Sequence, residues 1–120
     1  EGSGVDMLLG VGGAPEGVLA AAALKCMGGD MQGRLVFMNN EERDRATSMG
    51  INDFEKVYQC DEMANGDVVF AATGVTSGEL LRGIRYFSGG AETHSIVMRS
   101  KSRTIRFIEA RHSFDFKPKY

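Results

Sequence analysis

The sequence predicts an α/β fold, in which helices cover a sheet, on two observations. Within the first 38 residues an apolar segment is followed by a glycine-rich loop, an alanine-rich helix and a second apolar segment. That order is typical of a βαβ unit, which places two parallel strands side by side with a right-handed crossover. Further along, short segments rich in β-branched and aromatic residues alternate with turn residues, as expected of additional strands.

The βαβ unit is expected to occupy the N-terminal part of the chain. A strand covered on both faces is expected over residues 5–11, which are apolar with one exception and are bounded by glycines. A buried helix is expected over residues 15–27, because Pro15 favours a first helical turn and apolar side chains occur on every side. A pair of glycines, Gly28 and Gly29, is then expected to end the helix, because glycine readily takes the left-handed backbone conformation of a C-cap. Residues 34–38 suit the second strand.

The rest of the chain predicts shorter elements. An exposed helix is expected over residues 40–49, a short strand over 57–58 and a helical turn over 61–64. A further strand is expected over 67–72, and an antiparallel hairpin over 94–98 and 104–109. The polar loop 73–78 follows a strand, as the glycine loop at 10–17 does. Ligands bind beyond the carboxyl ends of strands in open α/β sheets, so we expect both loops on one rim. The hydroxyl groups in the loop, Thr73, Thr76 and Ser77, are expected to bond their own backbone.

Composition favours one soluble, cytoplasmic domain that acts on a small molecule. The 120 residues are 42% hydrophobic, which is enough for a core, and a net charge of -2 gives no field for nucleic acid or an anionic membrane. No apolar run approaches the roughly 20 residues of a membrane span, and no secretory signal is evident. Cys26 and Cys60 lack metal-ligand spacing and are expected to be reduced.

The glycine loop is the segment best suited to chemistry. A dinucleotide fingerprint does not fit, because Pro15 occupies the place of its third glycine, and the lysine of a phosphate-binding P-loop is missing. The Glu16 carboxylate would repel a phosphate unless a cation lay between them. Mg²⁺ and Mn²⁺ take oxygen ligands from carboxylates, water and substrate phosphate together. Glu16 is therefore a candidate metal ligand, and the backbone N–H groups around Gly12 and Gly13 are candidates for holding the substrate.

Two blander interpretations of the loop stay open. Glu16 can simply favour the helix dipole, a gain of about 0.3 to 1 kcal/mol. The loop can also hold a sugar phosphate or a nucleotide without chemistry, as part of a non-catalytic α/β module. The two histidines, His94 and His112, belong to no nucleophile or metal constellation, and His94 is expected to be structural.

Several strings carry a resemblance to one family, namely GGAPEGV at residues 12–18, GDMQGRL at 29–35, AATGVT at 71–76, LLRGIRYF at 80–87 and THSIVMRS at 93–100. In that order they closely resemble the class II, or bacterial type, fructose-1,6-bisphosphatases. The resemblance implies layered sheets and helices of the lithium-sensitive sugar phosphatase, or inositol monophosphatase-like, type. It also implies hydrolysis of the 1-phosphate of fructose 1,6-bisphosphate to fructose 6-phosphate, a step of gluconeogenesis. Some members also accept sedoheptulose 1,7-bisphosphate.

The resemblance carries over to few site residues. Glu16 matches a metal ligand, for Mn²⁺ or Mg²⁺, and Gly13 matches a backbone position that contacts the substrate, with Gly12 beside it. The family's other metal carboxylates and the threonine linked to activation of the attacking water lie in an N-terminal part that has no counterpart here. The resemblance therefore predicts no catalytic residue in this chain, a C-terminal domain over residues 1–110, a tail over 111–120, little activity for the isolated chain, and a homo-oligomeric parent protein.

Overall fold

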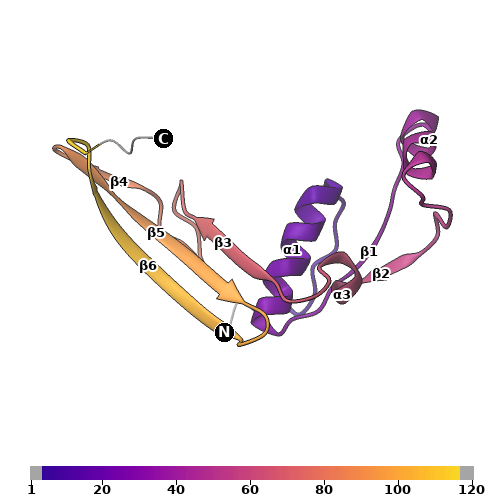
Figure 1. The fold of residues 1–120 in the computed structure, drawn as a ribbon, viewed down its shortest axis with the longest axis horizontal. Coiled ribbons are helices and arrows are strands. Elements are labelled where there is room, and N and C mark those ends of the chain that lie inside the picture. The colour runs from indigo at the N-terminus through magenta and orange to yellow at the C-terminus, as the bar shows by residue number, and fades with distance from the viewer. Residues whose placement is uncertain (1–3, 117–120) are drawn as a thin grey trace.

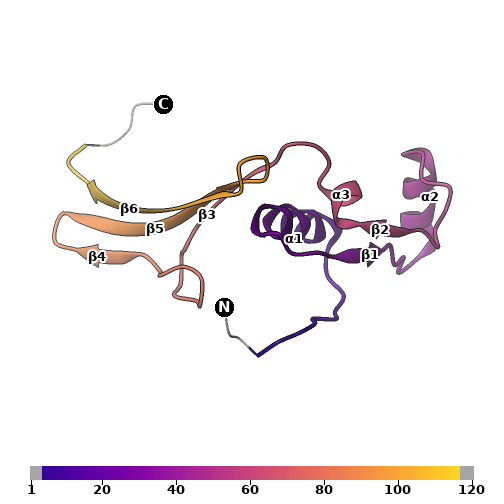
Figure 2. The same ribbon diagram turned by 90° about the horizontal axis from the view of Figure 1, so that it is seen from below.

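The computed structural model describes residues 4–116 as an elongated arrangement of helices and antiparallel sheets (Figures 1 and 2). In chain order the elements are α1 (Ala14–Met27), β1 (Gln32–Arg34), α2 (Asn40–Ser48), β2 (Val57–Gln59), α3 (Cys60–Met63), β3 (Val69–Thr73), β4 (Arg85–Phe87), β5 (Gly90–Arg99) and β6 (Thr104–Ser113). The extents are 54 × 35 × 26 Å and the radius of gyration is 18.4 Å. A compact chain of this length would have a radius of about 14 Å, so much apolar surface stays exposed.

The larger sheet is built around β5. β6 pairs with the whole of β5 on one side, from Gly90↔Ser113 to Arg99↔Thr104. On the other side β3 and β4 share β5 between them, with β3 along residues 95–99 and β4 along residues 90–92. All of these pairings are antiparallel, and β5 is the only described strand that pairs with β6.

Helix α1 joins the sheet to the rest of the molecule, and Figure 1 shows it at the centre. Alanine favours the helix, Pro15 lies in its first turn, and Gly28 ends it at φ 79, a conformation that suits glycine. Ala21 packs with Cys60 and Ala64 near α3. Cys26 packs with Ile96 and Met98 of β5. The described core thus contains two small clusters, and each has one fully buried residue from α1 at its centre.

A second unit extends from the opposite side of α1. β1 and β2 form an antiparallel pair, Gly33↔Tyr58 at its centre, and α2 projects beyond them (Figure 1). Asn39 caps α2 by accepting a hydrogen bond from the Glu42 backbone N–H at 2.9 Å. Phe37 and Phe54 meet edge to face beside this helix, with ring centroids 4.9 Å apart.

Most predicted elements are confirmed. The helices expected over 15–27 and 40–49 are α1 and α2. The short strand, helical turn, strand and hairpin correspond to β2, α3, β3, and β5 with β6. The hairpin strands are longer than predicted, and β6 continues to Ser113, while residues 117–120 of the predicted tail lie outside the described residues. Helices and sheets confirm a mixed α/β chain; the inositol monophosphatase-like arrangement remains a prediction.

The prediction of a parallel βαβ unit is wrong. Residues 5–11 have no regular secondary structure, and Leu8 and Leu9 are 89% and 83% exposed. The strand expected over 34–38 is instead the short β1, which pairs antiparallel with β2. A strand exists only where a neighbouring strand takes its hydrogen bonds, and no described strand runs beside residues 5–11.

Candidate metal and substrate site

The glycine loop leads into the start of α1, as the sequence predicts. Gly13 is the N-cap residue, with φ -65 and ψ 148, and its carbonyl accepts the first helical hydrogen bond from Gly17 N–H at 3.0 Å. Pro15 and Glu16 lie in the first turn, and Glu16 is exposed. The positive end of the helix dipole and the open N–H groups there favour an anion.

The Glu16 side chain folds back over Gly13. A Cβ built on Gly13 would overlap Glu16 Oε2 and lie 3.2 Å from Glu16 Cδ. A Cβ built on Gly12 or Gly10 would meet nothing within 4 Å. Among the described residues the Glu16 carboxylate has no ion pair or hydrogen bond, so its oxygens are available to a ligand.

Glu16 is the one acidic ligand candidate in this loop region. Within residues 4–116 no group of three His, Cys, Asp or Glu side chains is arranged to hold a metal ion. The carboxylate offers a hard oxygen of the type that Mg²⁺ and Mn²⁺ bind, and it lies over the backbone of Gly13. The residues present therefore fit one corner of a divalent metal site.

The second loop, between β3 and β4, is held by its own contacts. Ser77 Oγ accepts a hydrogen bond from Gly83 N–H at 3.0 Å, and Thr73 Oγ1 lies 2.8 Å from Ser95 Oγ. Ser77 therefore bonds the backbone of its own loop, as expected, whereas the Thr73 hydroxyl contacts the Ser95 side chain on β5 instead. The predicted common rim is not seen, because Figures 1 and 2 show this loop well apart from the start of α1 and no described hydrogen bond joins them.

Both histidines have structural partners. His94 Nδ1 accepts a hydrogen bond from Arg82 N–H at 2.9 Å, and the His94 ring stacks on Phe107 with centroids 5.6 Å apart. His112 Nε2 lies 2.9 Å from Thr93 Oγ1. The expectation that His94 is structural therefore agrees with its contacts.

Asp67 has a role that the sequence did not reveal. Arg99 Nε donates to its carboxylate at 3.0 Å, and Ser100 Oγ and Lys101 N–H donate to it at 3.2 Å each. The Arg99 guanidinium, as the largest cause, and then the Lys101 and Ser100 bonds lower the pKa of Asp67, although partial burial opposes them. Asp67 thus ties the start of β3 to the β5–β6 turn, a contact between segments 32 residues apart.

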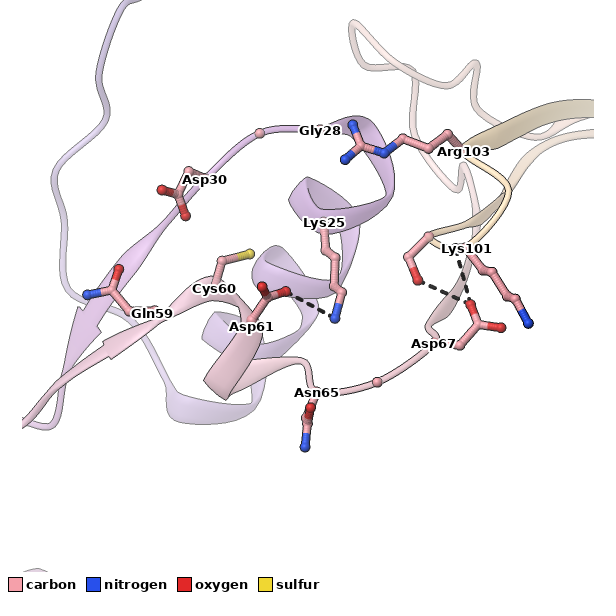
Figure 3. Close-up of a pocket in the computed structure, with 13 residues that line it drawn as sticks. Lys25, Gly28, Asp30, Gln59, Cys60, Asp61, Asn65, Asp67, Lys101 and Arg103 are labelled. Atoms are coloured by element: carbon pink, nitrogen blue, oxygen red, sulfur yellow. Dashed lines mark hydrogen bonds and ion pairs between the residues drawn. The ribbon is translucent and has the colours of Figure 1, made fainter.

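A cavity of about 830 Å³ opens at the other end of α1 (Figure 3). On one side of it Lys25 Nζ lies 3.1 Å from Asp61 Oδ1 and donates to Ala64 O at 2.9 Å. Cys60 lines the cavity, and burial raises the pKa of its thiol, which favours the unreactive form. The lining includes neither Glu16 nor Gly13, so this cavity is separate from the candidate metal site.

The helices among the described residues are all too short or too polar to cross a membrane. The start of α1 combines backbone N–H groups that favour an anion with an exposed carboxylate of the type that divalent cations bind, in a mixed α/β chain. These features suit the broad class of phosphate-handling proteins.

Comparison with known proteins identifies the family within that class. Residues 1–112 match the family described as bacterial fructose-1,6-bisphosphatase, glpX-encoded. The chain is 45% identical, over 95% of its length, to the D-fructose 1,6-bisphosphatase class 2/sedoheptulose 1,7-bisphosphatase of Synechococcus sp. (strain JA-3-3Ab). It is 43% identical, over 99% of its length, to the protein of the same name from Microcystis aeruginosa (strain NIES-843 / IAM M-2473).

The chain belongs to the bacterial, class 2 fructose-1,6-bisphosphatase family. It spans 37% of the length of the Synechococcus relative and 38% of the Microcystis relative. The resemblance noted from the sequence strings is thereby confirmed.

Proposed function

We propose that this chain is the C-terminal portion of a metal-dependent fructose-1,6-bisphosphatase and supplies one wall of its active site. The parent protein, meaning the longer polypeptide that includes this portion, hydrolyses the 1-phosphate of fructose 1,6-bisphosphate to give fructose 6-phosphate and phosphate. Sedoheptulose 1,7-bisphosphate is a second substrate. Support comes from the names of the relatives, which carry both activities, and from the match over residues 1–112.

Glu16 is the metal ligand in this proposal. The observation that carries it is an exposed carboxylate without a competing partner among the described residues, folded over the loop at the positive end of α1. Manganese or magnesium suits such a ligand because both prefer oxygen donors. When bound, such a cation lowers the pKa of its water and offsets negative charge on the phosphate oxygens.

Gly13 and Gly12, next to Glu16, are the residues that contact the substrate in this proposal. Neither residue has a side chain, so a sugar phosphate can approach the backbone closely. The backbone N–H groups at the start of α1 and the helix dipole both attract phosphate oxygens. In this chain these residues bind and orient the substrate, and we assign no catalytic residue to it.

The exposed apolar surface supports the assignment as a portion of a larger protein. Val18 and Leu19 on α1 are 45% and 58% exposed, although they belong to a helix that is apolar on all sides. Single exposed apolar residues are normal, but seven large ones are exposed within residues 5–19, and in this proposal another segment covers them. In the proposal the remainder of the parent protein covers it and brings the further carboxylates, so the isolated chain has little or no activity. The cytoplasmic location and the homo-oligomeric state also remain proposals.

The test is Glu16→Gln in the parent protein, assayed for phosphate release from fructose 1,6-bisphosphate across a Mn²⁺ titration. Loss of a carboxylate ligand should weaken metal activation at least about a hundredfold, the upper range for loss of a partner that only orients a ligand. Glu41→Gln is the matched control, since Glu41 is also an exposed carboxylate in the first turn of a helix, α2.

The outcomes separate the interpretations. Near-normal turnover and metal dependence of Glu16→Gln would refute the ligand assignment. A parent protein that binds fructose 1,6-bisphosphate but releases no phosphate with Mn²⁺ or Mg²⁺ would favour the non-catalytic sugar-phosphate or nucleotide-binding module instead.

A further inference from the structure

The turn between α3 and β3 contains the one asparagine of the sequence that a glycine follows. Asn65 and Gly66 are both exposed and lie outside helix and strand. Gly66 has φ 78, in the left-handed region, so the turn itself favours glycine at this position. The backbone of the turn thus places an Asn–Gly pair at the surface.

Neither of the two groups of this pair that can react with each other is engaged within the fold. Among residues 4–116 the Asn65 side chain and the Gly66 N–H take part in no hydrogen bond or ion pair. Figure 3 shows the Asn65 amide directed away from Lys25 and Asp61. A Cβ built on Gly66 would meet nothing within 4 Å, so no neighbouring atom crowds the turn there. The Asn65 amide carbon and the Gly66 nitrogen are therefore free to approach each other.

The reaction open to this pair is ring closure. The Gly66 backbone nitrogen attacks Asn65 Cγ, so that an N–Cγ bond forms and the Cγ–Nδ2 bond breaks. The proton of the Gly66 N–H moves to Nδ2, which leaves as ammonia. The product is a five-membered succinimide, and water adds to one of its two carbonyl groups to give aspartate or isoaspartate. The attack is intramolecular, and glycine has no side chain to obstruct it.

The pair lies between two points at which the chain is anchored. Before it, Ala64 O accepts a hydrogen bond from Lys25 Nζ at 2.9 Å, which ties the turn to α1. After it, Asp67 accepts a hydrogen bond from Arg99 Nε at 3.0 Å, which ties the start of β3 to β5. In isoaspartate the main chain runs through the side-chain methylene, so one extra carbon enters the backbone between the two anchors. The Lys25 side chain is flexible and can follow this change, whereas Asp67 is held by several groups at once.

We propose that Asn65–Gly66 is a site of spontaneous deamidation, at which the protein ages, and that its isoaspartyl product weakens the Asp67 anchor between β3 and the β5–β6 turn. The site is independent of the candidate metal site and of the activity proposed above.

The experiment incubates the purified full-length protein in mildly alkaline buffer, which favours attack by the backbone nitrogen, and follows each asparagine by peptide mass spectrometry. Asn52 is the matched internal control, because it is exposed and has no described partner but is followed by Asp53. Asn65 should convert at least about tenfold faster than Asn52, a ratio that corresponds to a barrier lower by about 1.4 kcal/mol. Isoaspartate should form beside aspartate, and electron-transfer fragmentation distinguishes the two.

Two variants at residue 65 separate ring closure from its effect on stability. Asn65→Gln keeps a neutral amide but would need a six-membered ring, so it should convert at least about tenfold more slowly than Asn65. Asn65→Asp carries the new charge on a normal backbone. The converted protein should melt about 3 °C or more below the fresh protein, the shift for loss of a hydrogen bond to a charged group in a large domain. Incubated Asn65→Gln and fresh Asn65→Asp should both melt within about 1 °C of it.

The role of the anchor is tested in Asp67→Asn, where conversion of Asn65 should lower the melting temperature no further. Conversion of Asn65 no faster than that of Asn52, or conversion to aspartate without isoaspartate, would overturn the deamidation site. A converted protein that melts like the fresh one, or that loses as much stability with Asp67→Asn as without it, would overturn the effect on the anchor.

Discussion

Gly74→Ala tests how tightly the loop between β3 and β4 is packed. Gly74 is buried at the end of β3, and a Cβ there would overlap the Arg82 carbonyl oxygen and lie 3.0 Å from its carbonyl carbon. The Cβ would also lie 3.1 Å from Leu81 Cβ. These atoms belong to backbone or to the base of a side chain, so the segment around Arg82 has to move.

The cost follows from two effects. Forcing an extra methyl group into a packed site typically costs about 1–3 kcal/mol. Movement of Arg82 also breaks the bond from its N–H to His94 Nδ1, which is 2.9 Å long, and a hydrogen bond of this kind contributes about 1 kcal/mol. We therefore expect Gly74→Ala to lower the free energy of unfolding by roughly 2–4 kcal/mol.

The assay is thermal and urea denaturation of the protein, together with hydrogen exchange at the Arg82 and Ile84 amides. The melting temperature should fall by about 5 °C or more, since 1 kcal/mol shifts a large domain by about 2–4 °C. Gly78→Ala is the control, because Gly78 lies in the same loop and a Cβ there meets nothing within 4 Å. Equal melting temperatures for the two variants would refute the packing argument.

Two further predictions concern the core and the pH dependence. Met98→Ala should lower the free energy of unfolding in urea by about 2–5 kcal/mol, because Met98 is fully buried against α1. Met98→Leu keeps most of the side-chain volume and should lower it by less than about 1.5 kcal/mol. Equal losses for the two variants would contradict this packing argument. Asp67→Asn should melt lower than the unsubstituted protein at neutral pH. Arg99 lowers the pKa of Asp67 in the folded protein, so the stabilisation by the Asp67 carboxylate is complete above the ordinary aspartate pKa and is lost as the pH falls through the lowered value. The difference in melting temperature between the two proteins should therefore shrink in acid. A difference that stays constant with pH would exclude the Asp67–Arg99 ion pair as its cause.

Local signals made part of the fold predictable. Pro15 at the start, the alanine run and the left-handed Gly28 at the end define α1 almost to the residue. The polar turn after Arg99 likewise predicts the β5–β6 hairpin. The location of Glu16 in the first turn of a helix also followed from the sequence, because it depends only on neighbouring residues.

Long-range contacts account for most of what the sequence did not reveal. Residues 5–11 have strand-like composition, but a strand forms only beside a partner, and composition does not say which segment that is. β4 is only three residues long, and its pairing with β5 depends on a loop pinned by His94 and Gly74. The fold of Glu16 over Gly13 is a matter of side-chain direction, which residue spacing alone does not fix.

β6 is an edge strand of the described sheet, and this position affects how the chain behaves in concentrated solution. Of the described strands only β5 pairs with it, so its outer row of N–H and C=O groups is a template for stacking further chains. Arg106, Glu109 and Arg111 place charges along this strand, and charged side chains on an edge strand oppose such stacking. Salt screens charges beyond about 8–10 Å at moderate ionic strength. Raising the salt concentration should therefore promote aggregation of the chain, and low-salt buffers should keep it dispersed.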